Sequence, residues 1–93
     1  MNIRFQWDPY KAAANWQRHR VRFQEAIEAF FDPNAIENYD EEHADSEDRF
    51  RLIGMSHRRL LFVVYSEPTP GTVRIISARK AEQKQQRYYE QAN

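Results

Sequence analysis

One stretch limits the fold more than any other: residues 60–65, Leu-Leu-Phe-Val-Val-Tyr, are apolar at every position. A half-exposed strand alternates apolar and polar residues, so an unbroken apolar run of this length predicts a central strand covered on both faces. Apolar segments at residues 50–55 and 73–78 flank it, joined by short turns at 57–59 and 68–71. Short connections favour antiparallel neighbours. The sequence therefore predicts an antiparallel meander over residues 49–79.

The N-terminal part predicts a strand followed by a helix. Residues 3–7 alternate apolar and polar side chains, which is typical of a strand. Asp8 and Pro9 then suit the N-cap and the first position of a helix, which we expect to run to about His19. Three apolar residues should form its inner stripe: Ala12, Ala13 and Trp16.

Three further elements complete the predicted order. Phe23, Ala26, Ile27 and Phe30 stand at helical spacing and predict a second helix, which should stop near residue 32 because Pro33 disfavours helix before it. A short strand is expected at residues 34–39 and a polar loop at 40–48. Residues 80–91 are polar and rich in good helix formers, which predicts a C-terminal helix with a thin apolar face.

These elements indicate an α+β fold in one domain over residues 1–93: an N-terminal strand and two helices packed on an antiparallel sheet, then a C-terminal helix. A chain of 93 residues has room for one core. The absence of cysteine excludes disulfides, zinc–thiolate sites and thiol nucleophiles, and fits a reducing compartment. No apolar run is long enough to cross a membrane, so we expect a cytoplasmic protein without membrane contact.

Opposite charges are segregated along the chain although they balance overall. The remainder outside residues 32–48 holds 14 basic and 6 acidic residues, a net charge of +8. A basic face of this kind is the footprint of phosphate binding, whereas the acidic stretch can equally be a solvated loop. The eight acids within residues 32–48 are Asp32, Glu37, Asp40, Glu41, Glu42, Asp45, Glu47 and Asp48.

The arginines of the predicted strands form the densest group of candidate functional residues. Alternation puts Arg79 on one face with Ser77 and Ile75, and Arg49 on one face with Arg51. If the strands are neighbours, these guanidiniums converge, and Tyr65 or Tyr88 lies beside them. Cations and aromatic rings together suit RNA phosphates and bases. The alternative is that the arginines pair with the acidic stretch.

The histidines give weaker signals. His19 ends the first helix, where the helix dipole favours an imidazolium; it is either a general base or a structural residue. His43 lies in the acidic loop at residues 40–45, which has metal-ligand residue types without a fixed spacing. A solvated loop explains it better, so we expect no metal and no cofactor.

Short motifs in a fixed order carry a family resemblance. Over residues 3–89 the chain resembles the BrnT-type toxins of bacterial type II toxin–antitoxin systems. The motifs are Trp7-Asp8, Lys11, Asn15, His19, Val21-x-Phe23-x-Glu25-Ala26, Asp32-Pro33, Glu47-x-Arg49-Phe50, Ile53-Gly54-x-Ser56, Val63-Val64-Tyr65 and Arg74-Ile75-Ile76-Ser77-Ala78-Arg79.

The resemblance implies a RelE-like fold, ribonuclease activity and neutralisation by a cognate BrnA-type antitoxin. Such a complex would repress its own operon, with the antitoxin making the contacts to operator DNA. The chain departs from the family pattern at Arg20, where the family tends to have glycine, and at Glu82 and Gln85, where it usually has threonine and glutamate. If those tail positions serve catalysis, the departures bear on activity.

The resulting hypothesis is a metal-independent endoribonuclease toxin that inhibits translation and growth, by attack of an RNA 2′-hydroxyl on the adjacent phosphate to leave a cyclic phosphate. One alternative is a non-catalytic domain that binds its antitoxin and contributes to operon autoregulation; a weaker one is a metal-dependent nuclease using residues 40–45. For the first hypothesis, Arg79 and Arg49 stabilise the phosphate, Lys11 or His19 handles protons, and Tyr65 or Tyr88 orients or stacks. The remaining RNA-binding candidates are Arg51, Arg74 and Ser77.

Overall fold

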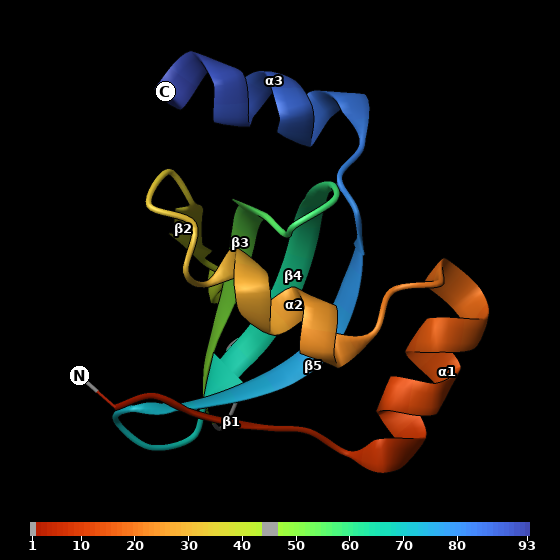
Figure 1. Cartoon of the computed structure of the whole chain (residues 1–93). Helices are drawn as coiled ribbons and strands as arrows, with labels where there is room; N and C mark the ends of the chain where they lie inside the picture. The colour runs from red at the N-terminus through yellow and green to blue at the C-terminus, as the bar shows by residue number, and fades with distance from the viewer. Residues whose placement is uncertain (1, 44–46) are drawn as a thin grey trace.

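A computed structural model describes residues 2–43 and 47–93 and contains a five-stranded mixed sheet with three α-helices (Figure 1). The strand order is β1-β5-β4-β3-β2. The strands are β1 (Arg4–Gln6), β2 (Ile36–Tyr39), β3 (Asp48–Met55), β4 (Leu60–Glu67) and β5 (Thr72–Lys80). The helices are α1 (Pro9–His19), α2 (Phe23–Ala29) and α3 (Gln83–Ala92), and a short 3₁₀ turn spans Glu41–His43.

The central position of the apolar strand is confirmed, because β4 lies third of five and pairs antiparallel with both β3 and β5. The antiparallel meander over residues 49–79 is confirmed, but the N-terminal strand, which was expected to pack on this sheet, joins it at one edge instead. There β1 pairs parallel with β5, with Phe5 opposite Val73. Burial of Phe5 against the core, where its ring contacts Phe30 at 5.2 Å, accounts for the position of β1. The sheet is therefore mixed.

The helices take up three different positions around the sheet. In Figure 1, α2 crosses in front of the sheet, α1 stands beside β5, and α3 lies across one end of the strands. Helix α3 begins at residue 83, three residues later than expected, because β5 continues to Lys80. None of the helices in the described part of the chain is long and apolar enough to cross a membrane.

Helix α2 approaches the sheet closely at Gly54 of β3. A Cβ built on Gly54 would lie 2.5 Å from the carbonyl oxygen of Ala29, so only glycine allows the helix to sit this low. Asp32 holds the following turn: its carboxylate accepts from the backbone N–H of Asn34 and Met55, at 2.9 and 2.8 Å, and from the Tyr89 hydroxyl at 2.7 Å. This one carboxylate therefore joins α2, β3 and α3.

A closed ion-pair network joins α2 to the β3–β4 hairpin. Arg59 donates through Nε and Nη2 to the two carboxylate oxygens of Glu25, at 3.0 and 2.9 Å, and through Nη2 to the carbonyl of Arg20 at 2.8 Å. The Ser56 hydroxyl donates to Glu25 at 2.7 Å. Burial raises the pKa of Glu25, but the hydrogen bonds from Arg59 and Ser56 lower that pKa overall. We call this network the hairpin junction.

The predicted apolar stripe of α1 is partly wrong. Ala13 is exposed, whereas the polar residue Asn15 is 6% exposed. Asn15 Nδ2 donates to the carbonyls of Val21 and Ala78, at 2.9 and 2.8 Å, and the Ala78 N–H donates to Asn15 Oδ1 at 3.0 Å. The side chain thus bonds to β5 as a neighbouring strand would, where β1 has already ended. This pairing attaches α1 to the sheet.

Strand register places several arginines on one face of the sheet, opposite to α2. Residues directly paired across strands point to the same side. One paired row runs from Arg51 through Val64 to Ser77, and the next from Ile53 through Phe62 to Arg79. We call this side the open face. Arg49 belongs to it too, paired through Ser66 with Arg74.

A register shift between Val64 and Tyr65 corrects one predicted neighbour on β5. Ser77 pairs with Val64 and Ile75 with Tyr65, so Ile76 is the extra residue of a bulge. Ser77 and Arg79 share the open face as expected. Ile75, expected with them, lies in the core instead and is 1% exposed.

Candidate active site

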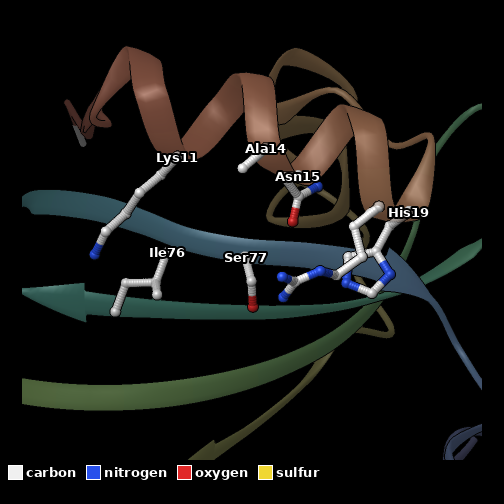
Figure 2. Close-up of a pocket in the computed structure, with 7 residues that line it drawn as sticks. Lys11, Ala14, Asn15, His19, Ile76 and Ser77 are labelled. Carbon is white, nitrogen blue, oxygen red and sulfur yellow. The ribbon is translucent and has the colours of Figure 1, made fainter.

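A polar pocket lies where α1 meets the bulged part of β5. Its volume is about 170 Å³. Figure 2 shows Lys11 and His19 reaching toward β5 from the turns of α1 on either side of Asn15, with Ser77 below. Positions four apart lie on one face of a helix, so the α1 sequence itself aligns these three side chains. The lining residues are Lys11, Ala14, Asn15, Arg18, His19, Ile76 and Ser77.

The pocket is strongly cationic. Among the described residues that line it are Lys11, Arg18 and His19, and no carboxylate. Burial, followed by the charges of Arg18 and Arg79, lowers the pKa of His19 below its usual 6.5. The helix dipole would favour an imidazolium at this position, but burial first, and then the two guanidiniums, oppose the positive charge and lower the pKa of His19.

Arg79 lies at the edge of this pocket and is held loosely. Its guanidinium stacks on the ring of Phe62, 4.6 Å from the ring centre, and donates weakly to the carbonyl of Lys80 at 3.3 Å. The nearest carboxylate, Glu82, is 3.7 Å away and its side chain is 72% exposed. Most of the hydrogen-bonding capacity of Arg79 is thus available to an anion.

A second pocket, of about 190 Å³, opens between α3 and the open face. It contains two of the predicted RNA-binding residues, Arg51 and Tyr88. Phe62 lines this pocket while Arg79 covers the same ring, so Arg79 lies between the two pockets. The lining residues are Asn38, Arg51, Ile53, Phe62, Lys84, Gln85 and Tyr88.

Arg74 and Arg49 lie further along the open face, away from both pockets. Arg74 donates to both carboxylate oxygens of Glu47, at 3.1 and 3.2 Å, and Glu47 also accepts from Ser66 at 2.7 Å. The alternative considered from the sequence, pairing with the acidic stretch, thus holds for Arg74. Within residues 2–43 and 47–93, Arg49 and Arg51 form no ion pair.

The prediction that Tyr65 lies beside these arginines is wrong. Tyr65 is 2% exposed and faces the core, where its ring stacks on Phe50 at 5.3 Å and contacts Phe30 edge-on at 4.9 Å. When a strand is apolar at both odd and even positions, its sequence does not indicate which of the two sets faces the helices. Of the two tyrosines considered, only Tyr88 is on the open side, 46% exposed.

Sequence reasoning gave no site role to Arg18, Asn38 or Lys84, and it named Asn15 and Gln85 only in the comparison with the family pattern. A signal for α1 was present: positions 11, 14, 15, 18 and 19 have the spacing of one helix face. The search for an apolar stripe overlooked this polar one. The sequence around Asn38, Lys84 and Gln85 does not indicate that they share a pocket, because β2 and α3 are far apart in the chain and come together only in the folded protein.

The metal-site hypothesis for residues 40–45 lies partly outside the described residues. Among those described, no group of three or more histidine, aspartate or glutamate side chains gathers as metal ligands would.

Comparison with known proteins shows which family the chain belongs to. The model of the family described as "Ribonuclease toxin, BrnT, of type II toxin-antitoxin system" matches residues 7–85. The chain belongs to this family. It is therefore a ribonuclease toxin by family, and a type II toxin has an antitoxin as its partner. No curated protein matches the chain.

The fold is similar to that of a solved member. The crystal structure of the Brucella abortus ribonuclease toxin BrnT aligns with a TM-score of 0.60 and 18% sequence identity, over 88% of this chain and 100% of that one. At this identity the likeness concerns the fold: an α+β arrangement with a mixed five-stranded sheet and three helices.

The departures from the family pattern have structural roles here. Arg20 takes the left-handed conformation, φ 56° and ψ 37°, and still caps α1 with its N–H on the carbonyl of Trp16. Glu82 and Gln85 form a capping box at the start of α3, with the Glu82 N–H donating to Gln85 Oε1 at 2.8 Å. These two residues thus begin α3, whatever else they do.

Proposed function

We propose that this toxin is a metal-independent endoribonuclease whose reaction takes place at the α1–β5 pocket. The observation that carries the proposal is a histidine with a lowered pKa beside Lys11, Arg18 and Arg79, in a pocket whose described lining lacks carboxylates. A phosphodiester is an anion that needs charge stabilisation and proton transfer for cleavage, and these groups supply both.

In the proposed reaction the RNA 2′-hydroxyl attacks the adjacent phosphorus. The O2′–P bond forms while the P–O5′ bond breaks, which leaves a 2′,3′-cyclic phosphate and a 5′-hydroxyl. His19 accepts the proton of the 2′-hydroxyl, and Lys11 donates a proton to the departing 5′-oxygen. Arg79 stabilises the charge on the phosphoryl oxygens, and Ser77 positions one of them. Only the protein's own groups take part, so no metal ion is required.

The remaining candidates contribute to RNA binding. Arg51 and Tyr88 bind the nucleotide next to the reacting phosphate, and Arg49 binds the backbone further along the open face. Arg74, fixed by Glu47, contributes positive potential and no direct contact. Tyr65 takes no direct part because it is buried on the opposite face.

In the cell, we propose that this activity acts in the cytoplasm, stops translation and arrests growth until a BrnA-type antitoxin binds. The antitoxin would carry the contacts to operator DNA. A RelE-like classification fits the order of elements and an arginine-bearing face of the sheet opposite to α2.

The test compares two histidines of the same chain. We expect His19→Gln to slow cleavage of a purified transcript by about 10²-fold or more, because a general base is lost. His57→Gln, at an exposed residue paired with Glu28, should leave the rate unchanged. Products should carry 5′-hydroxyl ends, and EDTA should have no effect.

Three results would contradict this proposal. Loss of activity in EDTA would indicate a metal. Equal cleavage rates for His19→Gln and His57→Gln would show that the reaction does not depend on His19 of α1. Intact RNA with folded wild-type protein would favour a domain that only binds its antitoxin.

A further inference from the structure

The pocket between α3 and the open face combines an apolar floor with polar groups around it. Ile53 and Phe62 provide the floor from β3 and β4, and Tyr88 provides an aromatic wall from α3. An enclosed cavity of about 150 Å³ admits a benzene ring. The 190 Å³ of this open pocket therefore has room for one flat aromatic group.

The polar groups of the pocket are mainly hydrogen-bond donors. Arg51 and Lys84 carry donors only. Gln85 uses its Oε1 to accept from the Glu82 N–H at 2.8 Å, so its Nε2 donors remain for a ligand. Asn38, whose carboxamide carries both a donor and an acceptor, completes the group. A ligand with several acceptors along one edge is therefore matched better than one with donors.

The pocket is also adjacent to the proposed reacting phosphate. Phe62 forms part of its floor, and the Arg79 guanidinium lies 4.6 Å from the centre of that ring. Neighbouring strands are about 4.8 Å apart, and Phe62 and Arg79 are directly paired on β4 and β5. An RNA phosphate held by Arg79 would thus place a neighbouring base at this pocket.

We propose that this pocket binds one base of the RNA next to the cleaved bond and reads its exocyclic group at pyrimidine C4 or purine C6. It selects uracil and guanine, which carry an oxygen there, over cytosine and adenine, which carry an amine. The proposal rests on the ribonuclease function above and adds the choice of substrate. Uracil presents two carbonyl oxygens, and guanine presents O6 and N7, the acceptor pair that arginine binds with two donors. The exocyclic amine of cytosine or adenine would instead face Arg51, Lys84 and Gln85.

The experiment uses the full chain and four RNA oligonucleotides that differ at a single base beside the cleavage site. We expect kcat/KM to be about tenfold or more higher with uracil or guanine than with cytosine or adenine, since one well-placed base contact of this kind discriminates by that factor or more. Replacing guanine with 2-aminopurine, which lacks O6, should remove the advantage although the ring still stacks.

Variants locate the selection in this pocket. Gln85→Met keeps the length of the side chain and removes its donors, so the base preference should fall to within about threefold while RNA is still cleaved. Gln83→Met, at an exposed position of the same helix, is the matched control and should retain the full preference. Gln85→Met also removes half of the capping box, so Lys84→Met, which leaves that box intact, is the second variant.

Failure of this inference can be told from failure of the ribonuclease function. If the wild type cleaves all four oligonucleotides equally, or prefers cytosine or adenine, the pocket does not select bases with an oxygen at pyrimidine C4 or purine C6. If the wild type cleaves none of them, fluorescence anisotropy measures binding of the same four. Tighter binding of uracil or guanine, lost in Gln85→Met but not in Gln83→Met, would still support the pocket, and equal affinities would overturn it.

Discussion

Two regions at opposite ends of the α1–α2 connection each contain an arginine and a histidine, yet they differ in what surrounds the charges. At the hairpin junction Arg59 forms two hydrogen bonds with Glu25, and His57 Nδ1 lies 2.8 Å from Glu28. At the α1–β5 pocket the charges of Arg18 and Arg79 act on His19, and Glu82, the carboxylate that the described residues place near Arg79, is mostly exposed.

Whether an arginine already has a well-aligned carboxylate partner distinguishes structural arginines from candidate functional ones better than residue type or charge does. A guanidinium with two well-aligned carboxylate bonds is already satisfied and contributes to stability. A guanidinium stacked on an aromatic ring, with its donors open, is held in place and can still bind an anion. The same two residue types therefore support the fold in one region and offer chemistry in the other.

The largest expected effect comes from removing the arginine of the pocket. Arg79→Ala should slow RNA cleavage by about 10²–10³-fold, as loss of a group that stabilises transition-state charge does. Its melting temperature should change little, because an exposed substitution alters stability by only about 0.5 kcal/mol. A cleavage time course run beside a thermal melt measures both. An unfolded variant would show that Arg79 is structural, and a wild-type rate would exclude it from the site.

The arginine of the junction should give the opposite result. Arg59→Ala leaves Glu25 without its partner at 10% exposure and should cost about 2–3 kcal/mol of unfolding free energy. For a domain of this size that lowers the melting temperature by roughly 10–20 °C. Cleavage measured well below the melt should be unchanged. Arg58→Ala, at an exposed position, is the control. If Arg59→Ala melts at the same temperature as Arg58→Ala, the junction contributes no stability.

A third substitution tests whether the two regions are independent. Arg20 follows His19 in the chain, and its backbone carbonyl accepts a hydrogen bond from Arg59. Arg20→Gly relieves a left-handed conformation that is unfavourable for arginine. It also loses a cation–π contact with Trp16 at 5.2 Å. We expect a net gain of about 0.5–1 kcal/mol in stability with unchanged cleavage. A change in rate would show that the junction controls the position of His19.

The smallest expected effect is a shift of pH dependence. Cleavage needs neutral His19, so activity should fall as the pH drops through the His19 pKa, which lies below 6.5. Arg18→Gln removes one of the charges that lower this pKa, so the acid limb of kcat/KM should move to higher pH. Arg22→Gln is the control, since the Arg22 guanidinium lies over Trp16, 4.1 Å from the ring centre. Identical acid limbs for both variants would exclude His19 as the titrating group.

Much of the fold could be predicted because its signals are local. The apolar run at residues 60–65 marked the central strand, and Asp8 with Pro9 marked the start of α1, where the Asp8 carboxylate accepts from the Tyr10 N–H at 2.9 Å. The parallel pairing of β1 with β5 could not be predicted, since it joins residues almost 70 positions apart and has no turn between them to indicate it.

The site was predicted less completely, because the sequence does not show which face of a strand a side chain lies on or where the pairing of two strands shifts by a residue. Lys11, His19 and Ser77 were named from the sequence and line one pocket, whereas Arg79 acts on His19 through its charge and does not line that pocket. The face on which Tyr65 lies depends on whether the helices cover the odd or the even positions of β4. That choice depends on how all the elements pack together. The position of Ile75 depends on one bulge residue, which leaves no recognisable mark in an apolar strand.

The pairing of Asn15 with Ala78 has a consequence for the entropy of catalysis. Lys11 and His19 stand one turn to either side of Asn15, and Ser77 and Arg79 are the chain neighbours of Ala78. Two hydrogen bonds between these two residues therefore fix the helix-borne groups against the strand-borne groups before any RNA arrives. The loss of conformational freedom needed to assemble the proposed site occurs when the chain folds, and the binding energy of RNA remains available to align the attacking hydroxyl with its phosphorus.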